Sequence, residues 1–167
     1  LLGCRMLVDE IIEQGSDVGD ARFYAEAFAK AGMDFISLST GGKFDDAQQP
    51  KVGEAVYPYT GQSGFECMPT VYADPRGPFL RNISKMATLK AHLKAQQLNT
   101  PIIVAGGIQT FEQAESVLQT GQGDIIGSAR QSLADPDWFL KMKLGKGDEI
   151  RRCAMTNYCE ALDTRHK

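Results

Sequence analysis

Two short stretches of the chain contain residue types that together could bind an anion: Gly106-Gly107 and Ser128-Ala129-Arg130. Glycine has no side chain, so its backbone N–H can approach an oxyanion closely. Ala129 is small enough to permit the same approach. The Arg130 guanidinium adds a cation whose planar set of donors matches a phosphate. We expect the two stretches to form one phosphate site, and the alternative for Arg130 is an ordinary ion pair at the rim of the fold.

The residues around these stretches predict the elements that would position them. Residues 101–105 and 124–127 are short apolar runs of the kind found in buried parallel strands. Between them, Thr110 and Gln113 form a capping box at the start of a helix that Gly121 ends. The carboxyl ends of neighbouring parallel strands meet at one edge. In (β/α)8 barrels, a phosphate commonly binds at the loops after strands 7 and 8.

Earlier residues continue the alternation of strands and helices. Residues 1–8 and 34–39 have the composition of strands, and residues 82–98 have apolar side chains at helical spacing. Strands that alternate with helices in this way predict an α/β fold with a parallel sheet. No internal repeat is visible beyond this alternation.

Two further helices are expected from their capping residues. One begins after Asp17 or Asp20 and runs to residue 31. Its apolar stripe should consist of Phe23, Ala27, Phe28 and Ala31. The other helix, over residues 137–144, should be capped by Asp135 with Pro136 as its first residue.

Arg5 is an ionisable residue in the middle of the first predicted strand. Alternation along a strand puts Arg5 on the inner face of the sheet. The opposite face, which should meet the helices, carries Leu2, Cys4, Met6 and Val8. A charged side chain that points inward is costly unless an anion or a strong acceptor contacts it. The alternative is an Arg5 paired with an Asp or Glu near the end of the strand.

The chain divides into a βα region over residues 1–152 and a tail over residues 153–167. Residues 43–80 interrupt the βα region as an irregular insertion, rich in Tyr, Phe and Pro and without a sustained period. Long irregular segments often form lids or substrate-binding walls. Tyr57, Tyr59 and Tyr72 could therefore line a substrate site, or they could pack the insertion on itself.

The composition argues against several classes of function. The 18 basic and 21 acidic residues give a net charge of −3 without a basic stripe, so we expect no nucleic-acid partner. The apolar runs are too short to span a membrane, and no signal-peptide pattern opens the chain. Four cysteines form no dense disulfide pattern, which favours a reducing, cytoplasmic location.

No residue can be assigned a catalytic role from the sequence. The two histidines are poorly placed for acid–base chemistry, because His92 lies beside lysines on a predicted solvated helix face and His166 lies in the tail. The catalytic residues of the site therefore remain unknown at this level.

Four motifs, in this order, resemble the C-terminal part of the Old Yellow Enzyme family of FMN-dependent NAD(P)H:flavin oxidoreductases. They are VAGGIQTFEQAE, DIIGSAR, LADPDW and EIRRCAMTNYC. The resemblance implies a (β/α)8 TIM barrel of which this chain is about the C-terminal half. It also implies that Gly106, Gly107, Ala129 and Arg130 hold the FMN phosphate and that Arg5 contacts the flavin ring. Ala129 departs from the family, where glycine is frequent.

The resemblance further implies an ene reductase. NAD(P)H would reduce the FMN, and the flavin would pass hydride to an activated alkene or a similar small-molecule acceptor. A missing N-terminal half of the barrel, a second copy or another chain would then complete the site. Two alternatives remain, namely another FMN- or phosphate-binding barrel enzyme and an isolated half barrel that only binds a phosphate ligand.

Cys153 and Cys159 occupy the region in which dienoyl-CoA reductase relatives bind an iron–sulfur cluster. In those relatives the spacing is Cys-x2-Cys-x3-Cys, whereas Thr156 stands here at the second position. A [4Fe–4S] cluster normally needs four thiolates, and this segment offers two. We therefore expect no metal centre in this chain.

Overall fold

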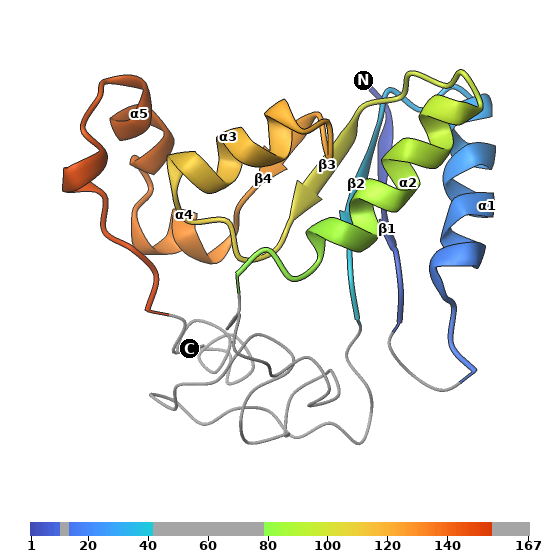
Figure 1. The fold of residues 1–167 in the computed structure, drawn as a ribbon, viewed down its shortest axis with the longest axis horizontal. Helices are drawn as coiled ribbons and strands as arrows, with labels where there is room; N and C mark the ends of the chain where they lie inside the picture. The colour runs from blue at the N-terminus through green and yellow to red at the C-terminus, as the bar shows by residue number, and fades with distance from the viewer. Residues whose placement is uncertain (11–13, 42–78, 155–167) are drawn as a thin grey trace.

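A four-stranded parallel sheet, in the order β1-β2-β3-β4, forms the centre of the structure (Figure 1). The structure is a computed structural model that describes residues 1–10, 14–41 and 79–154. The strands are β1 (Gly3–Leu7), β2 (Phe35–Ser39), β3 (Ile102–Ala105) and β4 (Ile125–Gly127). The helices are α1 (Val18–Lys30), α2 (Ile83–Ala95), α3 (Phe111–Gln119), α4 (Arg130–Ala134) and α5 (Trp138–Lys143), with a 3₁₀ turn at Gly147–Glu149. All four predicted strands are confirmed.

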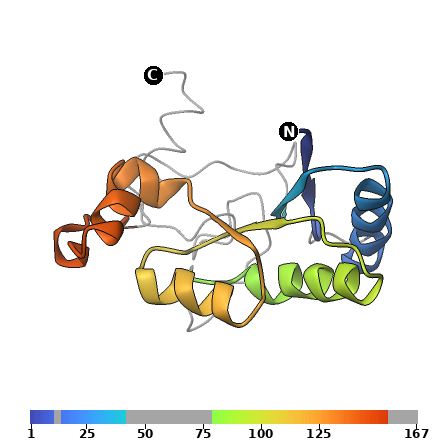
Figure 2. The ribbon, with the colours of Figure 1, turned by 90° about the horizontal axis from the view of Figure 1, so that it is seen from above.

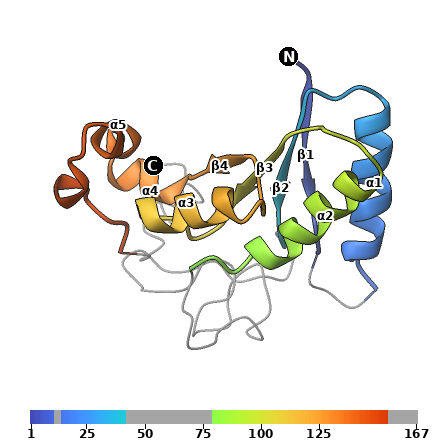
Figure 3. The ribbon, with the colours of Figure 1, turned by 45° about the horizontal axis from the view of Figure 1, so that its top comes forward.

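Helices cover one face of the sheet. Helices α1, α2 and α3 lie along the same side of the sheet, as the views from above and at an angle show (Figures 2 and 3). Each strand pairs with the next one along the chain, and a helix connects each pair. Sequential strand order with helices on one side is the arrangement of a barrel wall. In a doubly wound sheet the helices would cover both faces.

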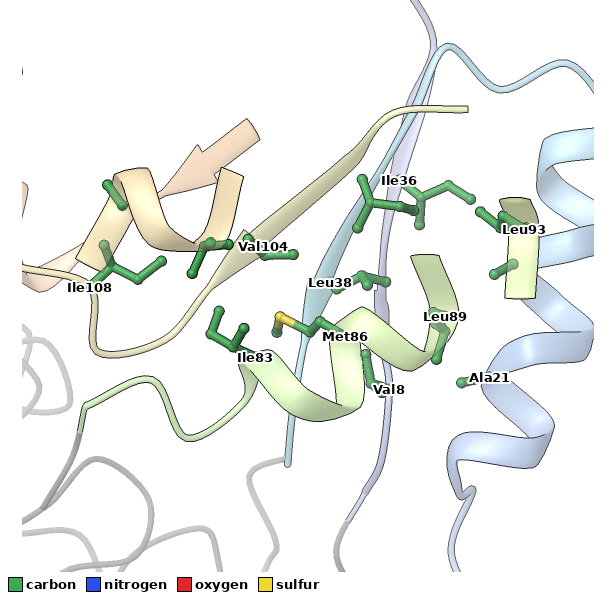
Figure 4. Close-up of a cluster of buried hydrophobic side chains, with 14 of the residues drawn as sticks. Val8, Ala21, Ile36, Leu38, Ile83, Met86, Leu89, Leu93, Val104 and Ile108 are labelled. Atoms are coloured by element: carbon green, nitrogen blue, oxygen red, sulfur yellow. The ribbon is translucent and has the colours of Figure 1, made fainter. Parts of the chain in front are cut away.

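The hydrophobic core fills the space between the sheet and the three helices (Figure 4). Helix α2 presents one continuous apolar face to it, formed by Ile83, Met86, Leu89 and Leu93. The strands contribute Ile36, Leu38, Ile102 and Val104 from their helix-facing positions, and Val8 adds to them directly after β1. Burying an aliphatic side chain of this size stabilises a fold by about 1.5–3 kcal/mol. Because the core takes up the helix-facing side chains, only the opposite face of each strand can contribute side chains to a binding site.

The apolar stripe predicted for α1 is wrong except at Phe28, which is partly buried and packs against the core. The helix buries Ala21, Ala25 and Ala29, whereas the Phe23 side chain is 71% exposed. Helix α1 packs against α2, and alanines four residues apart allow two helices to approach closely. Large side chains are therefore displaced from this contact, and Phe23 instead forms an edge-to-face pair with the Tyr24 ring at the surface.

Two of the three helix caps that the sequence predicts are observed. Asp17 and Asp20 form a capping box at α1, and Thr110 and Gln113 form the predicted one at α3. The N-cap residue of α5 is Asp137 and not Asp135 as predicted, although the Asp135 carboxylate does accept a hydrogen bond from the Asp137 N–H at 3.2 Å. Asp135 instead ends α4, and its buried carboxylate bonds to Lys141 and to the Arg151 N–H.

Two aspartates fix the sheet register at the amino ends of the strands. Asp34 precedes β2 and accepts a hydrogen bond from the Leu2 N–H at 2.6 Å. Asp124 precedes β4 and accepts one from the Ile102 N–H at 2.8 Å. Each aspartate also donates its own N–H to the carbonyl of the same partner residue. Because strand register is set here, the residues that meet at the opposite, carboxyl edge are set as well.

The predicted insertion at 43–80 and the tail at 153–167 lie almost entirely outside the described residues, as do Tyr57, Tyr59, Tyr72 and Cys159. Among the helices that the structure describes, none has the length and apolar character needed to cross a bilayer.

Candidate phosphate-binding edge

The two glycine- and arginine-containing stretches emerge side by side from the sheet. Ala105, the last residue of β3, is in register with Gly127, the last residue of β4. Neighbouring strands lie about 4.8 Å apart, so the loops that begin at Gly106 and Ser128 leave the same edge together. The Ser128 hydroxyl donates a hydrogen bond to the Ile108 carbonyl at 3.4 Å, which links the two loops directly.

Both glycines of the first loop have a backbone conformation that favours glycine. Gly106 has φ +124° and Gly107 has φ +70°. A Cβ atom at Gly106 would also lie 2.6 Å from Nδ2 of Asn82, the residue that precedes α2. The loop therefore turns sharply over the start of α2, and only a residue without a side chain fits at Gly106.

Helices α3 and α4, which follow the two strands, differ in whether a side chain caps the backbone N–H groups of their first turns. At α3, Thr110 accepts a hydrogen bond from the Gln113 N–H, and Gln113 accepts from the N–H groups of Gln109 and Thr110. Helix α4 begins with Ala129 at the N-cap position and has no side-chain cap. Backbone N–H groups at the start of a helix that lack a cap are suitable donors to an anion.

The first turn of α3 already carries a negative charge. The pKa of Glu112 is lowered, chiefly because its carboxylate accepts a hydrogen bond from its own backbone N–H and also bonds to the Thr110 side chain. The charge of Arg152 lowers this pKa further. An added anion would be repelled at α3, so within this edge the loop before α4 is the better place for a phosphate.

Arg5 is placed on the inner face of the sheet, as the alternation predicted. Its neighbours Cys4 and Met6 pack against the core on the other face, and Arg5 is in register with Ser37 of β2. The Arg5 side chain is exposed within the described part of the chain. The cost of burying a charge, from which we inferred an anion at Arg5, therefore does not apply to this part of the structure.

Three buried polar side chains that the sequence did not reveal hold one short segment against this edge. Gln131 is 2% exposed and Asp135 1% exposed. Gln131 donates to the Arg151 carbonyl at 2.8 Å and accepts from the Cys153 N–H at 3.0 Å. Asp135 accepts from the Arg151 N–H at 2.9 Å, and Gln109 donates to the Cys153 carbonyl at 2.8 Å.

The Asp135 carboxylate is also the centre of a small charged cluster. The Lys141 ammonium lies 2.7 Å from it, and its hydrogen bond, with that from the Arg151 N–H, holds the pKa of Asp135 below its ordinary value. The carboxylate therefore stays ionised although it is buried. The cluster joins α4, α5 and the segment after α5.

A second ion pair, also missed from the sequence, lies where β1 ends. The Lys85 ammonium of α2 contacts the Asp9 carboxylate at 2.5 Å, and both side chains are partly buried. The Gly41 N–H donates to the Asp9 carbonyl at 2.7 Å, which connects the ends of β1 and β2. This pair ties the start of α2 to the sheet edge that carries the candidate site.

His92 is not a solvated side chain as expected, because its Nε2 lies 2.8 Å from the Glu26 carboxylate of α1. The pair belongs to the contact between α1 and α2 rather than to the strand ends. Among the described residues, no group of three or more His, Cys, Asp or Glu side chains could hold a metal ion.

The residues at this edge fit the phosphate of a flavin mononucleotide. A doubly charged phosphate needs donors that it can approach closely and at least one cation. Glycine at positions 106 and 107, an uncapped first turn at Ala129 and the Arg130 guanidinium supply both. Flavin chemistry itself would come from the cofactor.

Comparison with known proteins identifies the family of the chain. Residues 62–149, more than half of the chain, match the model of the NADH:flavin oxidoreductase / NADH oxidase family. The chain is 26% identical to an NADH oxidase of Thermoanaerobacter brockii over 153 residues, which are 92% of this chain and 19% of that protein. It is 40% identical to a bilirubin reductase of Mediterraneibacter gnavus over 62 residues, or 37% of this chain and 10% of that protein.

A solved structure shows the same fold. The 6-hydroxypseudooxynicotine amine oxidase of Pseudomonas geniculata superimposes with a TM-score of 0.70 at 20% identity, over 98% of this chain and 20% of that one. The chain therefore spans about a fifth of these longer relatives. The α/β class and the partial (β/α)8 barrel expected from the sequence are confirmed. With its four parallel βα units and its family match, the chain belongs to the NADH:flavin oxidoreductase / NADH oxidase family.

Proposed function

We propose that the protein is an FMN-dependent NAD(P)H oxidoreductase of the Old Yellow Enzyme type and that this chain binds the FMN phosphate. The observation that carries the proposal is the edge at which β3 and β4 end in register at Ala105 and Gly127, so that Gly106-Gly107 and Ala129-Arg130 follow side by side. The family match supports the flavin and NADH. The preference for FMN, the use of NADPH and the reduction of an activated alkene are parts of the proposal.

The bound FMN would supply hydride transfer, first from NAD(P)H and then to the acceptor. The residues of this chain would bind and orient it. Gly106 and Gly107 would let backbone reach the phosphate oxygens, and Ala129 would donate from the start of α4. The Arg130 guanidinium would balance the phosphate charge. Holding the phosphate at one edge of the sheet would orient the ring relative to the strand ends.

Arg5 would act at the other end of the cofactor. It lies on β1, two strands from β3, which corresponds to about 10 Å across the sheet. A positive charge beside the flavin ring would favour the anionic reduced ring electrostatically. The proton donor and the groups that polarise the substrate are left to residues outside the described part of the chain.

Removal of the Arg130 charge tests the proposal. In the intact protein, Arg130→Ala should weaken FMN binding by about 2–4 kcal/mol, because a charge-assisted pair is lost at a partly desolvated site. The matched control is Arg22→Ala, since Arg22 is exposed on α1 far from this edge in the chain. Isothermal titration with FMN and with riboflavin, which lacks the phosphate, measures both affinities.

The expected result is a loss confined to FMN and to the Arg130 variant. Equal FMN affinity in wild type and Arg130→Ala would refute the assignment of the phosphate site. A protein that binds inorganic phosphate at this edge but neither FMN nor riboflavin would favour the alternative of a half barrel that only binds a phosphate ligand.

A further inference from the structure

Residues 151–153, which we call the strap, cross from one loop of the candidate site to the other. The strap follows α5 and the 3₁₀ turn and, in Figure 1, descends in red beside α4 toward the edge at which the strands end. Its contact at Gln109 belongs to the loop after β3, and its contacts at Gln131 and Asp135 belong to α4 and the residue that ends it. The strap is thus a peptide bridge between two loops that are separate in sequence.

The strap is held through its backbone. The N–H and carbonyl groups of both Arg151 and Cys153 are bonded by Gln109, Gln131 and Asp135. All three of these side chains are buried. A buried polar group without a partner costs about 1–3 kcal/mol, so the three side chains and the strap depend on one another. Displacement of the strap would remove the bonds of Gln109 and Gln131 to it, whereas Asp135 would keep its bond to Lys141.

The residues that hold the strap lie directly beside those proposed to hold the phosphate. Gln131 follows Arg130 in the chain, and Gln109 lies two residues after Gly107. A phosphate that is bound by donors from both loops requires a fixed distance between the loops. Where two loops move independently, binding must also order them, and that cost reduces affinity.

We propose that Gln109 and Gln131 are positioning residues that act through the strap to hold the two phosphate-binding loops at a fixed separation. This inference rests on the proposed FMN phosphate site and adds two residues to it. The side-chain amides of both glutamines bond to the strap, and neither is proposed to contact the cofactor. Their effect on affinity is therefore specific to a ligand whose phosphate is bound by both loops, and it is absent for the same ring without a phosphate.

The test compares FMN and riboflavin in the intact protein. Gln131→Leu and Gln109→Leu remove the amide groups while keeping similar side-chain size, and each should raise the FMN dissociation constant about tenfold or more. The riboflavin dissociation constant should stay within about twofold of wild type, since the lost contacts order only the phosphate loops. Gln119→Leu is the control, because Gln119 is exposed on α3 and bonds only to Glu115 among the described residues.

Hydrogen exchange in the wild-type protein provides a second readout that needs no variant. Binding of FMN should slow exchange at the amides of Arg151 and Cys153, and riboflavin at equal saturation should not. This measurement decides the question if either leucine variant fails to fold.

The outcomes separate the inference from the proposed function. Equal losses for FMN and riboflavin, or no loss for either, would overturn the positioning role and leave a structural role for the glutamines. Exchange at the strap that FMN does not change would overturn it as well. A wild-type protein that binds FMN no better than riboflavin would contradict the phosphate site itself, and the inference with it.

Discussion

Replacement of Gly106 by alanine should destabilise the protein more than the same change at any exposed glycine. Two costs add at this position. The backbone has φ +124°, outside the range that L-residues adopt readily, and such conformations cost of the order of 1–3 kcal/mol. The new Cβ would also lie 2.6 Å from Asn82 Nδ2 and 3.3 Å from the Asn82 Cβ, and overpacking costs about 1–3 kcal/mol.

Two other glycines separate these contributions. Gly121 ends α3 with φ +68°, and a Cβ atom added there would meet no other atom within 4 Å, so Gly121→Ala should cost about 1–2 kcal/mol from the backbone alone. Gly147 has open space and no positive φ. Gly147→Ala should therefore change the stability by less than about 0.5 kcal/mol. Gly106→Ala should cost about 2–5 kcal/mol when both terms apply.

The assay is urea unfolding of the intact protein followed by pulse proteolysis, with the shift in midpoint converted through the m-value. The expected order of midpoints is Gly147→Ala above Gly121→Ala above Gly106→Ala. A Gly106→Ala midpoint equal to that of Gly147→Ala would refute the close approach of this loop to Asn82. A Gly106→Ala midpoint equal to that of Gly121→Ala would show that the positive φ alone accounts for the loss of stability and that contact with Asn82 adds nothing.

Three further predictions follow from the same structure. Hydrogen bonds from Lys141 and from the Arg151 N–H lower the pKa of Asp135 below 3.8. The stability that the ionised carboxylate gives to the folded protein should therefore be complete above that pH and be lost as the pH falls through the lowered pKa. Acid-unfolding curves of the Asp135→Asn variant should consequently be flatter than those of the wild type below about pH 4. Iron and acid-labile sulfide analysis of anaerobically purified protein should find no cluster bound by Cys153, and stoichiometric iron at this segment would contradict that. Residues 1–167 alone should not oxidise NAD(P)H with an enone, because β1 and β4 are the unpaired edges of the described sheet and Arg5 is exposed. Turnover by a monomer, verified by light scattering, would refute this prediction.

The elements that could be predicted from the sequence are those whose signals are local. The strands were visible as apolar runs, and the capping boxes at Asp17 and Thr110 depend on residues three apart. The proximity of Gly106 to Ser128 also followed, since parallel strands joined by one helix bring their ends together. Each of these inferences used contacts within one βα unit.

The features that could not be predicted depend on contacts with residues that are distant in the chain. The buried face of α1 is chosen by α2, which lies more than fifty residues away, and a helical wheel of α1 alone favoured the larger Phe23. Gln109 and Gln131 bond to backbone groups 20 to 44 residues away. Glutamine in a loop or at the start of a short helix is normally exposed, and backbone acceptors leave no pattern in the sequence, so neither residue could be identified.

One discriminating signal at the candidate site was nevertheless present in the sequence. Helices α3 and α4 follow the strands β3 and β4, and of these two helices only α3 has a capping box, in which Thr110 and Gln113 bond to its first turn. At α4 the N-cap residue is Ala129, whose methyl group cannot accept a hydrogen bond, and the first helical residue is Arg130. A helix that caps itself has little need of an anion, whereas a first turn without a capping side chain can bond to one. The absence of a capping side chain at Ala129 therefore favours the loop before α4 over the loop before α3 as the place where the phosphate binds.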